Sequence, residues 1–238
     1  MEILIKLILA HLIGDFILQP YAWVKEKEKK KLKSPKLYLH VLIHLVVTAL
    51  LLWDLSLWPI ILIITGSHLV IDAIKISLKK KKNKRLLFFI DQLLHLAVIF
   101  WVSYAFADLN VETSFFDTNK TLLVITSVLF LTYPVATMMK VIFSKWNVKQ
   151  ITEANNQSLE NAGKIIGMLE RVLVFIFIIM NHWEAVGFLI TAKSVFRFGD
   201  LKEAKQRKLT EYVLIGTLIS FGVTILTAIA CQQFLYIL

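Results

Sequence analysis

The sequence predicts an all-α fold, a polytopic transmembrane helical bundle of about eight spans. Hydrophobic residues make up 57% of the 238 positions and charged residues only 18%. The mean hydropathy of +0.68 is too high for a soluble domain of this size. The apolar residues also gather in stretches of about 20 residues, the length that an α-helix needs to cross a hydrocarbon core. These observations exclude a soluble globular protein.

Apolar stretches separated by polar or basic segments define the predicted spans. Polar residues interrupt the first stretch and no small-residue cleavage site follows it, so we interpret it as a span and not as a signal peptide. The last stretch contains the one cysteine, Cys231, which has no partner for an intramolecular disulfide. The predicted spans are 3–23, 38–57, 58–78, 86–106, 121–143, 165–181, 184–199 and 211–236.

Lysine and arginine gather in three segments between spans. These are 25–36, 79–85 and 202–208. Basic residues in short loops stay on the cytoplasmic side, so these segments are predicted to be cytoplasmic and both chain ends to lie outside. The loops 53–59, 107–119 and 181–184 contain no lysine or arginine, which agrees with this orientation. The net charge of +10 fits basic loops beside anionic headgroups, and we expect no nucleic acid as a partner.

Three parts are predicted along the chain, in a multi-pass protein of the cytoplasmic (inner) membrane. Residues 1–106 form a four-span half, and 107–164 contain an outer loop, the fifth span and a cytoplasmic connector. Residues 165–238 contain three spans that pack with the fifth. The polar stretch 144–164 either links the two bundles or docks a cytoplasmic protein partner.

Each of the first four predicted spans carries two metal-ligating side chains, spaced by four residues. Such residues lie on one face of an α-helix, so each pair presents two ligand atoms in the same direction. Counted from the nearest basic segment, all four pairs lie roughly 9–21 Å deep, in one layer near the cytoplasmic side. The pairs are His11 with Asp15, His40 with His44, His68 with Asp72, and Asp91 with His95.

These pairs predict a metal centre. Ionisable side chains in hydrocarbon are costly unless paired or coordinated, and they usually mark a function. Bundles hold metals through ligands on facing helices, and imidazole with carboxylate suits zinc, manganese or iron. We predict one or two divalent transition-metal ions, with zinc favoured and all eight residues as candidate ligands. Asp15, Asp72 and Asp91 are also candidate catalytic groups, and the alternative is a structural polar network.

The same residues carry a resemblance to a known family. The blocks HLIGDFILQP, LYLHVLIH, GSHLVIDAIK and DQLLH resemble the pattern of an uncharacterised bacterial integral-membrane family, domain of unknown function three-three-zero-seven. The later blocks AGKIIGMLERVLVFI, GFLITAKSVFRF and EYVLIGTLISFG are similar to later parts of that family. The His/Asp pattern is also distantly similar to bacterial inner-membrane proteins described as metal-dependent hydrolases. Neither resemblance implies an established reaction.

Cations in the second half are candidates for binding an anionic substrate. Lys193 and Arg197 are four residues apart, so they share one helical face that suits a phosphate or carboxylate. Glu170 or Glu211 could instead neutralise them as interhelical ion pairs. The other candidates for substrate binding are Lys75 and Arg171. The residues predicted to orient ligands are Gln19, Gln92, Glu170 and Glu211.

The leading functional hypothesis is a membrane-embedded, cytoplasm-facing metal-dependent hydrolase that acts on an anionic phosphoester or acyl substrate, with lipids among the candidates. The alternative is a divalent-metal transporter or sensor. Transport needs polar access from both sides, but the outer halves of the first four spans are almost purely apolar. A third hypothesis is a non-catalytic scaffold that recruits a cytoplasmic partner through 144–164.

Overall fold

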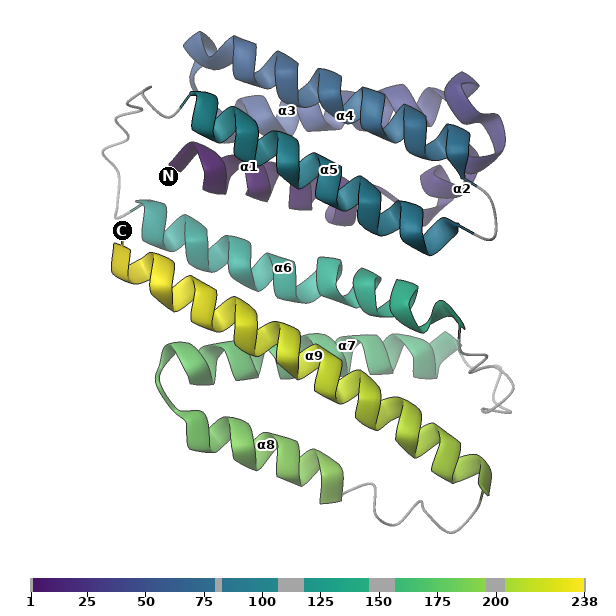
Figure 1. Cartoon of the computed structure of the whole chain (residues 1–238), viewed down its shortest axis with the longest axis vertical. Coiled ribbons are helices and arrows are strands. Elements are labelled where there is room, and N and C mark those ends of the chain that lie inside the picture. The colour runs from purple at the N-terminus through teal and green to yellow at the C-terminus, as the bar shows by residue number, and fades with distance from the viewer. Residues whose placement is uncertain (1, 80–82, 107–117, 146–156, 196–203, 238) are drawn as a thin grey trace. The chain divides into compact units, whose positions relative to one another are not determined.

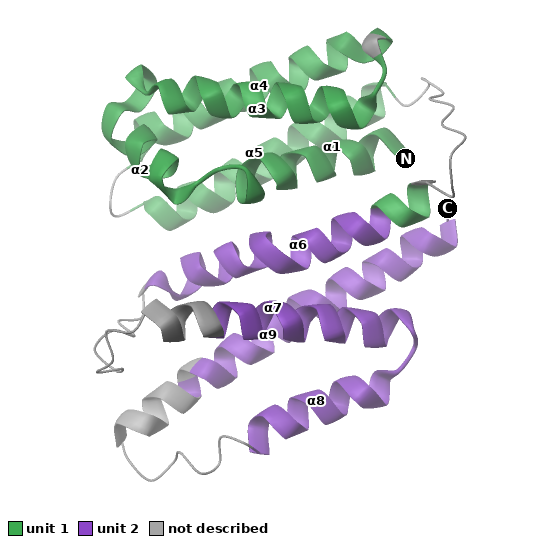
Figure 2. Cartoon of the chain, turned by 180° about the vertical axis from the view of Figure 1, so that it is seen from behind, with its two compact units in different colours: residues 1–122 green, residues 123–238 purple. Residues whose placement is uncertain are grey.

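The computed structural model describes residues 2–79, 83–106, 118–145, 157–195 and 204–237. Every described element is a helix, which confirms the predicted all-α class. The chain divides into two compact units, residues 1–122 and 123–238 (Figure 2). Most of the predicted outer loop, most of the connector 144–164, and Arg197 lie outside the described residues.

Four long helices of the first unit pack in a closed ring (Figure 1). Helix α1 contacts α3 and α5, and α4 contacts the same two helices. The bounds are Glu2–Leu12 for α1, Pro35–Leu52 for α3, Trp58–Leu78 for α4 and Lys84–Ala105 for α5. Proline lies in the first turn of both α3 and α4, where its missing N–H removes no intrahelical hydrogen bond.

The predicted first span is not one straight helix. Helix α1 continues as a π-helix, Ile13–Ile17, and α2 (Tyr21–Lys30) begins after a short break. The bend between the two arms is 83°, so the prediction of a continuous span over 3–23 is wrong. Pro20 explains the break, because proline lacks an N–H and disfavours helical backbone at the preceding residue. The bent pair is either a broken span or a re-entrant loop.

The interior of the first unit has an apolar layer and a polar layer. Ile60 and Ile64 of α4 belong to the apolar core, and the buried side chains that follow at the same spacing are His68 and Asp72. Because residues four apart share a helical face, one stripe of α4 lines both layers. The other helices contribute to the apolar layer in the same way, through Ile3, Leu7, Leu52, Ile99 and Val102.

The second unit has a single apolar core. The described helices of this unit are α6 (Thr118–Ile142), α7 (Gln157–Ile179), α8 (Trp183–Val195) and α9 (Ala204–Ile237). The first turns of α6 belong to the first unit. All four helices contribute buried side chains, among them Leu131, Ile178, Val186 and Phe221. Pro134 lies inside α6.

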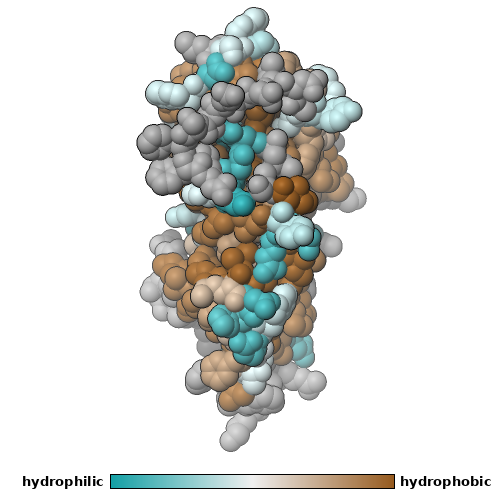
Figure 3. All heavy atoms as spheres, turned by 90° about the vertical axis from the view of Figure 1, so that its left-hand side faces the viewer, coloured by the Kyte–Doolittle hydropathy of each residue, from teal (hydrophilic) through white to brown (hydrophobic). Residues whose placement is uncertain are grey.

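Five described helices are long and apolar enough to cross a membrane, or six if the bent pair is one span. The predicted number of eight is not supported, because neither α7 nor α8 is among these helices. Helix α8 has 13 residues and extends only about 20 Å, short of a core of about 30 Å. Large apolar side chains are exposed on these helices, for example Leu93 at 66%, and apolar residues cover much of the face seen in Figure 3. The chain is a multi-pass membrane protein, and the side on which its ends lie stays a prediction.

Candidate metal centre

The four predicted pairs lie together in the polar layer of the first unit. Seven of the eight side chains are at most 4% exposed, and the side chain of Asp15 is 9% exposed. The eight residues, which we call the His/Asp network, are His11, Asp15, His40, His44, His68, Asp72, Asp91 and His95.

Asp15 is the centre of this network. Its Oδ1 lies 3.0 Å from His44 Nε2, 3.1 Å from His40 Nε2 and 3.5 Å from His68 Nε2. The ligand atoms of His11, Asp15, His44 and His68 all lie within 4.8 Å of one another. Ligands bound tetrahedrally at 2.0–2.1 Å are about 3.3 Å apart, so these side chains already have nearly the spacing of a metal site.

Gly14 makes room for His44. A Cβ atom at residue 14 would overlap the His44 imidazole, so a larger residue forces one of the two to move. Gly14 precedes Asp15 within the π-helix, and such turns are frequent at functional sites. The sequence analysis did not identify Gly14 as a site residue. Its position inside an apolar span and next to a carboxylate could have indicated this role.

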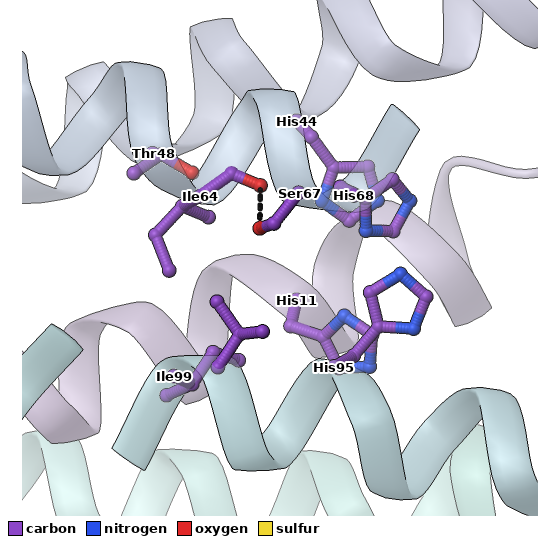
Figure 4. Close-up of a pocket in the computed structure, with 9 residues that line it drawn as sticks. His11, His44, Thr48, Ile64, Ser67, His68, His95 and Ile99 are labelled. Atoms are coloured by element: carbon purple, nitrogen blue, oxygen red, sulfur yellow. Dashed lines mark hydrogen bonds between the residues drawn. The ribbon is translucent and has the colours of Figure 1, made fainter. Parts of the chain in front are cut away.

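Four imidazoles line one side of a small cavity (Figure 4). They belong to His11, His44, His68 and His95, and we call the space the imidazole cavity. Its volume of about 10 Å³ is close to the minimum for one water molecule. Thr48, Ile64 and Ile99 line the opposite side. The cavity therefore provides nitrogen ligands on one side and a largely apolar wall on the other.

The backbone selects the tautomer of His95. Nδ1 donates to the carbonyl oxygen of Asp91 at 2.8 Å, so the neutral ring carries its lone pair on Nε2. That nitrogen is buried and has no hydrogen-bond partner among the described residues. The ring centroid lies 4.2 Å from that of His68 and 5.1 Å from that of His11. A buried lone pair beside other imidazoles suits a metal ligand.

A second set of ligand atoms belongs to His40, His68 and Asp72, but a cation already pairs with its carboxylate. These atoms also lie within 4.8 Å of one another, while Lys27 Nζ lies 2.7 Å from Asp72 Oδ2. Lys27 is only 3% exposed. Sequence analysis missed it, because Lys27 is one of seven lysines in 25–36, a segment that was assigned to a solvated loop.

A second cation, the partly buried Lys75, connects two carboxylates. Its Nζ donates to Asp91 Oδ2 and lies 3.5 Å from Asp72 Oδ1. Gln92 Nε2 also donates to Asp91 Oδ2, at 3.1 Å. Asp91 thus serves as an acceptor for Lys75 and Gln92 and belongs to neither of the two groups of metal-ligating atoms found among the described residues.

Two of the predicted orienting residues contact the network. Gln92 Nε2 donates to Asp15 Oδ2 at 3.1 Å, and its Oε1 lies 3.2 Å from His11 Nε2. Gln19 Nε2 lies 2.7 Å from His40 Nε2. Both amides therefore have the contacts needed to fix the ring positions.

Two of the four residues predicted to bind an anionic substrate, Lys193 and Arg171, lie in the described part of the second unit. Lys193 of α8 donates to Glu170 of α7, which is the interhelical ion pair that we considered as the alternative. Glu211 is exposed near the start of α9, and Arg197 lies outside the described residues. An anion at Lys193 would have to compete with Glu170, and its binding there stays a prediction.

Arg171 is held by neighbouring helices. It is 3% exposed; its Nε donates to the carbonyl oxygen of Leu131, its Nη1 to Ser220 Oγ at 3.2 Å, and its Nη2 to the carbonyl oxygen of Thr132 at 3.4 Å. Pro134 lies just beyond these carbonyl groups in α6. These contacts join α6, α7 and α9.

Comparison with known proteins gives one match. The family described as a protein of unknown function (DUF3307) matches residues 3–124, which include the whole His/Asp network and exclude the later blocks quoted above. No curated protein and no solved structure matches the chain. Since the match covers more than half of the 238 residues, the chain belongs to the DUF3307 family of proteins of unknown function.

Proposed function

We propose that this membrane protein is a metal-dependent hydrolase that acts on an anionic phosphoester or acyl substrate. The observation that carries the proposal is the approach of the ligand atoms of His11, Asp15, His44 and His68 to within 4.8 Å of one another, at the imidazole cavity. Zinc suits this donor set best, followed by manganese or iron. When bound, such an ion polarises the substrate and makes a water molecule more acidic.

The charge of the site favours an anionic substrate. Three carboxylates of the network face two ammonium groups, those of the buried Lys27 and the partly buried Lys75. With ionised carboxylates and neutral imidazoles the site carries one net negative charge, and a divalent cation changes this to one net positive charge. A phosphate or carboxylate ester would then enter a buried site of opposite charge, where the low dielectric strengthens the attraction.

Asp91 is the proposed general base. Its Oδ1 is buried and has no hydrogen-bond partner among the described residues, so it can accept the proton of the attacking water. The water oxygen bonds to phosphorus or to the carbonyl carbon, the bond to the ester oxygen breaks, and the proton passes from Asp91 to the leaving oxygen. Lys75, which already donates to Asp91, would stabilise the negative charge that develops on the substrate.

The apolar layer favours hydrolysis over transport. Beyond the imidazole cavity the described interior contains Ile64, Ile99, Ile60 and Val102, and none of these side chains can replace the hydration shell of an ion. We propose that the site opens towards the basic segments, at the cytoplasmic face of the inner membrane, because Lys27 and Lys75 lie on that side of the layer.

The test is the metal content of the purified protein, measured by inductively coupled plasma mass spectrometry. The wild type should hold stoichiometric metal after exposure to zinc, manganese or iron, and His44→Ala and His68→Ala should lose it. His182→Ala is the matched control, because His182 lies in the second unit with a side chain that is 54% exposed. All variants should elute as folded species in size-exclusion chromatography.

Activity is then measured on a panel of aryl phosphates, phosphodiesters and carboxylic esters. Hydrolysis that requires the metal and disappears in the two histidine variants, but not in His182→Ala, would support the proposal. A wild type without metal after reconstitution would reject the metal centre. A loaded wild type that hydrolyses none of the panel would reject the hydrolase and keep the metal centre.

A further inference from the structure

An open apolar groove runs between α4 and α5. Its volume is about 470 Å³, within the range of about 300–1,000 Å³ that is usual for small-molecule sites. Val70 of α4 and Leu94 and Trp101 of α5 line it, together with the small residues Gly66 and Ala97. A Cβ atom at Gly66 would have no neighbour within 4 Å. The groove therefore owes part of its space to the absence of a side chain at residue 66.

The groove is adjacent to the candidate metal centre. Ser67 and Val98 line both the groove and the imidazole cavity. The Ser67 hydroxyl donates to the carbonyl oxygen of Ile64 at 2.9 Å (Figure 4), so its one donor proton is already used within α4. Side chains of a single layer thus separate the apolar groove from the rings of His68 and His95.

The surroundings of the groove identify hydrocarbon as its occupant. Both α4 and α5 qualify as membrane spans, and the lining residues Val70, Leu94 and Trp101 are 56%, 46% and 60% exposed. A polar ligand would lose its hydrogen bonds to water there without new partners. The acyl chains of the bilayer, in contrast, lose nothing on entering an apolar groove at the same depth.

We infer that this groove binds an acyl chain of an anionic membrane lipid and that the ester or phosphoester group of that lipid lies next to the imidazole cavity, where Ser67 and Val98 line both spaces. The reacting group would then enter from the bilayer and not from water. As a statement about the substrate, this inference rests on the proposed hydrolase. Binding of the chain can be tested separately from the reaction.

The binding test uses phosphatidylglycerol with a photoreactive diazirine in its acyl chain. The purified protein is reconstituted in phosphatidylcholine vesicles that contain this probe, irradiated and digested, and the labelled residues are identified by mass spectrometry. We expect labelling concentrated on the groove residues of α4 and α5 and reduced by unlabelled phosphatidylglycerol. Gly66→Leu should lower this labelling about tenfold, the effect of excluding roughly two methylene groups from the groove.

Gly222→Leu is the matched control. Gly222 of α9 also has open space around its Cα but lies in the second unit, so this substitution should leave labelling of the groove unchanged. Labelling that is equal on all lipid-facing helices, or equal in Gly66→Leu and the wild type, would overturn the inference. If the groove stays unlabelled while other helices react, the groove is covered by protein. This result would also overturn the inference that it binds an acyl chain.

Metal content and hydrolysis distinguish failure of this inference from failure of the proposed function. Gly66→Leu should keep its metal, and it should lose hydrolysis of a long-chain lipid ester while retaining that of a short, water-soluble analogue. Equal loss with both substrates would reject the groove as the chain site. A wild type without metal would reject the hydrolase, whereas the labelling result would still decide whether the groove binds a chain.

Discussion

The two units of this protein each pack four long helices around one interior, but they fill it differently. Among the described residues, the interior of the first unit buries seven of the eight network side chains to 4% exposure or less, together with Lys27 at 3%. In the described part of the second unit, Arg171 is the one charged side chain that is buried to this degree. The first interior thus contains a layer of ionisable groups beside its apolar layer, whereas the described part of the second is an apolar core with a single buried cation.

The difference shows two ways to keep charge inside a membrane protein. The guanidinium of Arg171 donates hydrogen bonds to two backbone carbonyls and one hydroxyl. Such contacts hold packed helices together and require no ligand. The His/Asp network instead joins its ionisable groups to one another, as in the hydrogen bond of 3.0 Å between Nε2 of His40 and Nε2 of His68. Such a network is costly to bury in a membrane unless its groups are paired or coordinated.

The largest effect should follow from Asp15→Asn. The substitution removes the negative charge that Nε2 atoms of three histidines approach within 3.5 Å, while it keeps the size of the side chain. Metal affinity should fall at least about 100-fold, beyond the 10–100-fold usual for residues that only support ligands. Competition with a metal indicator dye measures this change, and an affinity within threefold of the wild type, roughly 0.7 kcal/mol, would contradict the central position of Asp15.

Gly14→Ala should damage the first unit through packing alone. The added methyl group overlaps the His44 ring, and overpacking of this kind costs about 1–3 kcal/mol. A lower midpoint of thermal unfolding, together with weaker metal binding, is expected in detergent micelles. Gly187→Ala is the control, because a Cβ atom at that residue meets nothing within 4 Å, and an equal loss in both variants would show that His44 is not the cause.

Arg171→Met should lower the stability of the protein without changing its metal content, because Arg171 lies in the second unit. Loss of the interhelical hydrogen bonds should destabilise the protein by about 2 kcal/mol, since such bonds in membranes contribute roughly 0.6 kcal/mol each and up to about 1.7. The metal content of the folded fraction should stay unchanged, in contrast to every change in the network. Loss of metal without loss of stability would refute the structural role given to Arg171.

The smallest effect is expected for Lys193→Gln. Lys193 and Glu170 form an ion pair with side chains that are 25% and 15% exposed, and partly exposed pairs contribute at most about 1 kcal/mol. Thermal unfolding should therefore shift only slightly, with full metal content. If hydrolysis of an anionic substrate falls while stability does not, Lys193 has the anion-binding role that the sequence suggested.

Periodicity made most of the candidate site predictable. The four pairs could be recognised because a spacing of four residues fixes a common face on any helix, and the packed helices bring these faces together. The contact of Gln19 with His40 does not follow from this spacing, because Gln19 lies in the break between the π-helix and α2. Lys27 could not be identified, because nothing local distinguishes it from the other lysines of its segment, and only the 83° bend brings it to Asp72.

By itself, then, the sequence determined the class of solvent, the helical fold and the His/Asp residues that lie together, since hydropathy and helical spacing are local properties of the chain. The tertiary structure decided which partner each ionisable group has. It paired Lys27 with Asp72, Lys193 with Glu170 and Arg171 with backbone carbonyls, and it placed Gly14 against His44. These contacts join residues far apart in sequence or on different helices, so they depend on how the helices bend and pack and not on any local pattern.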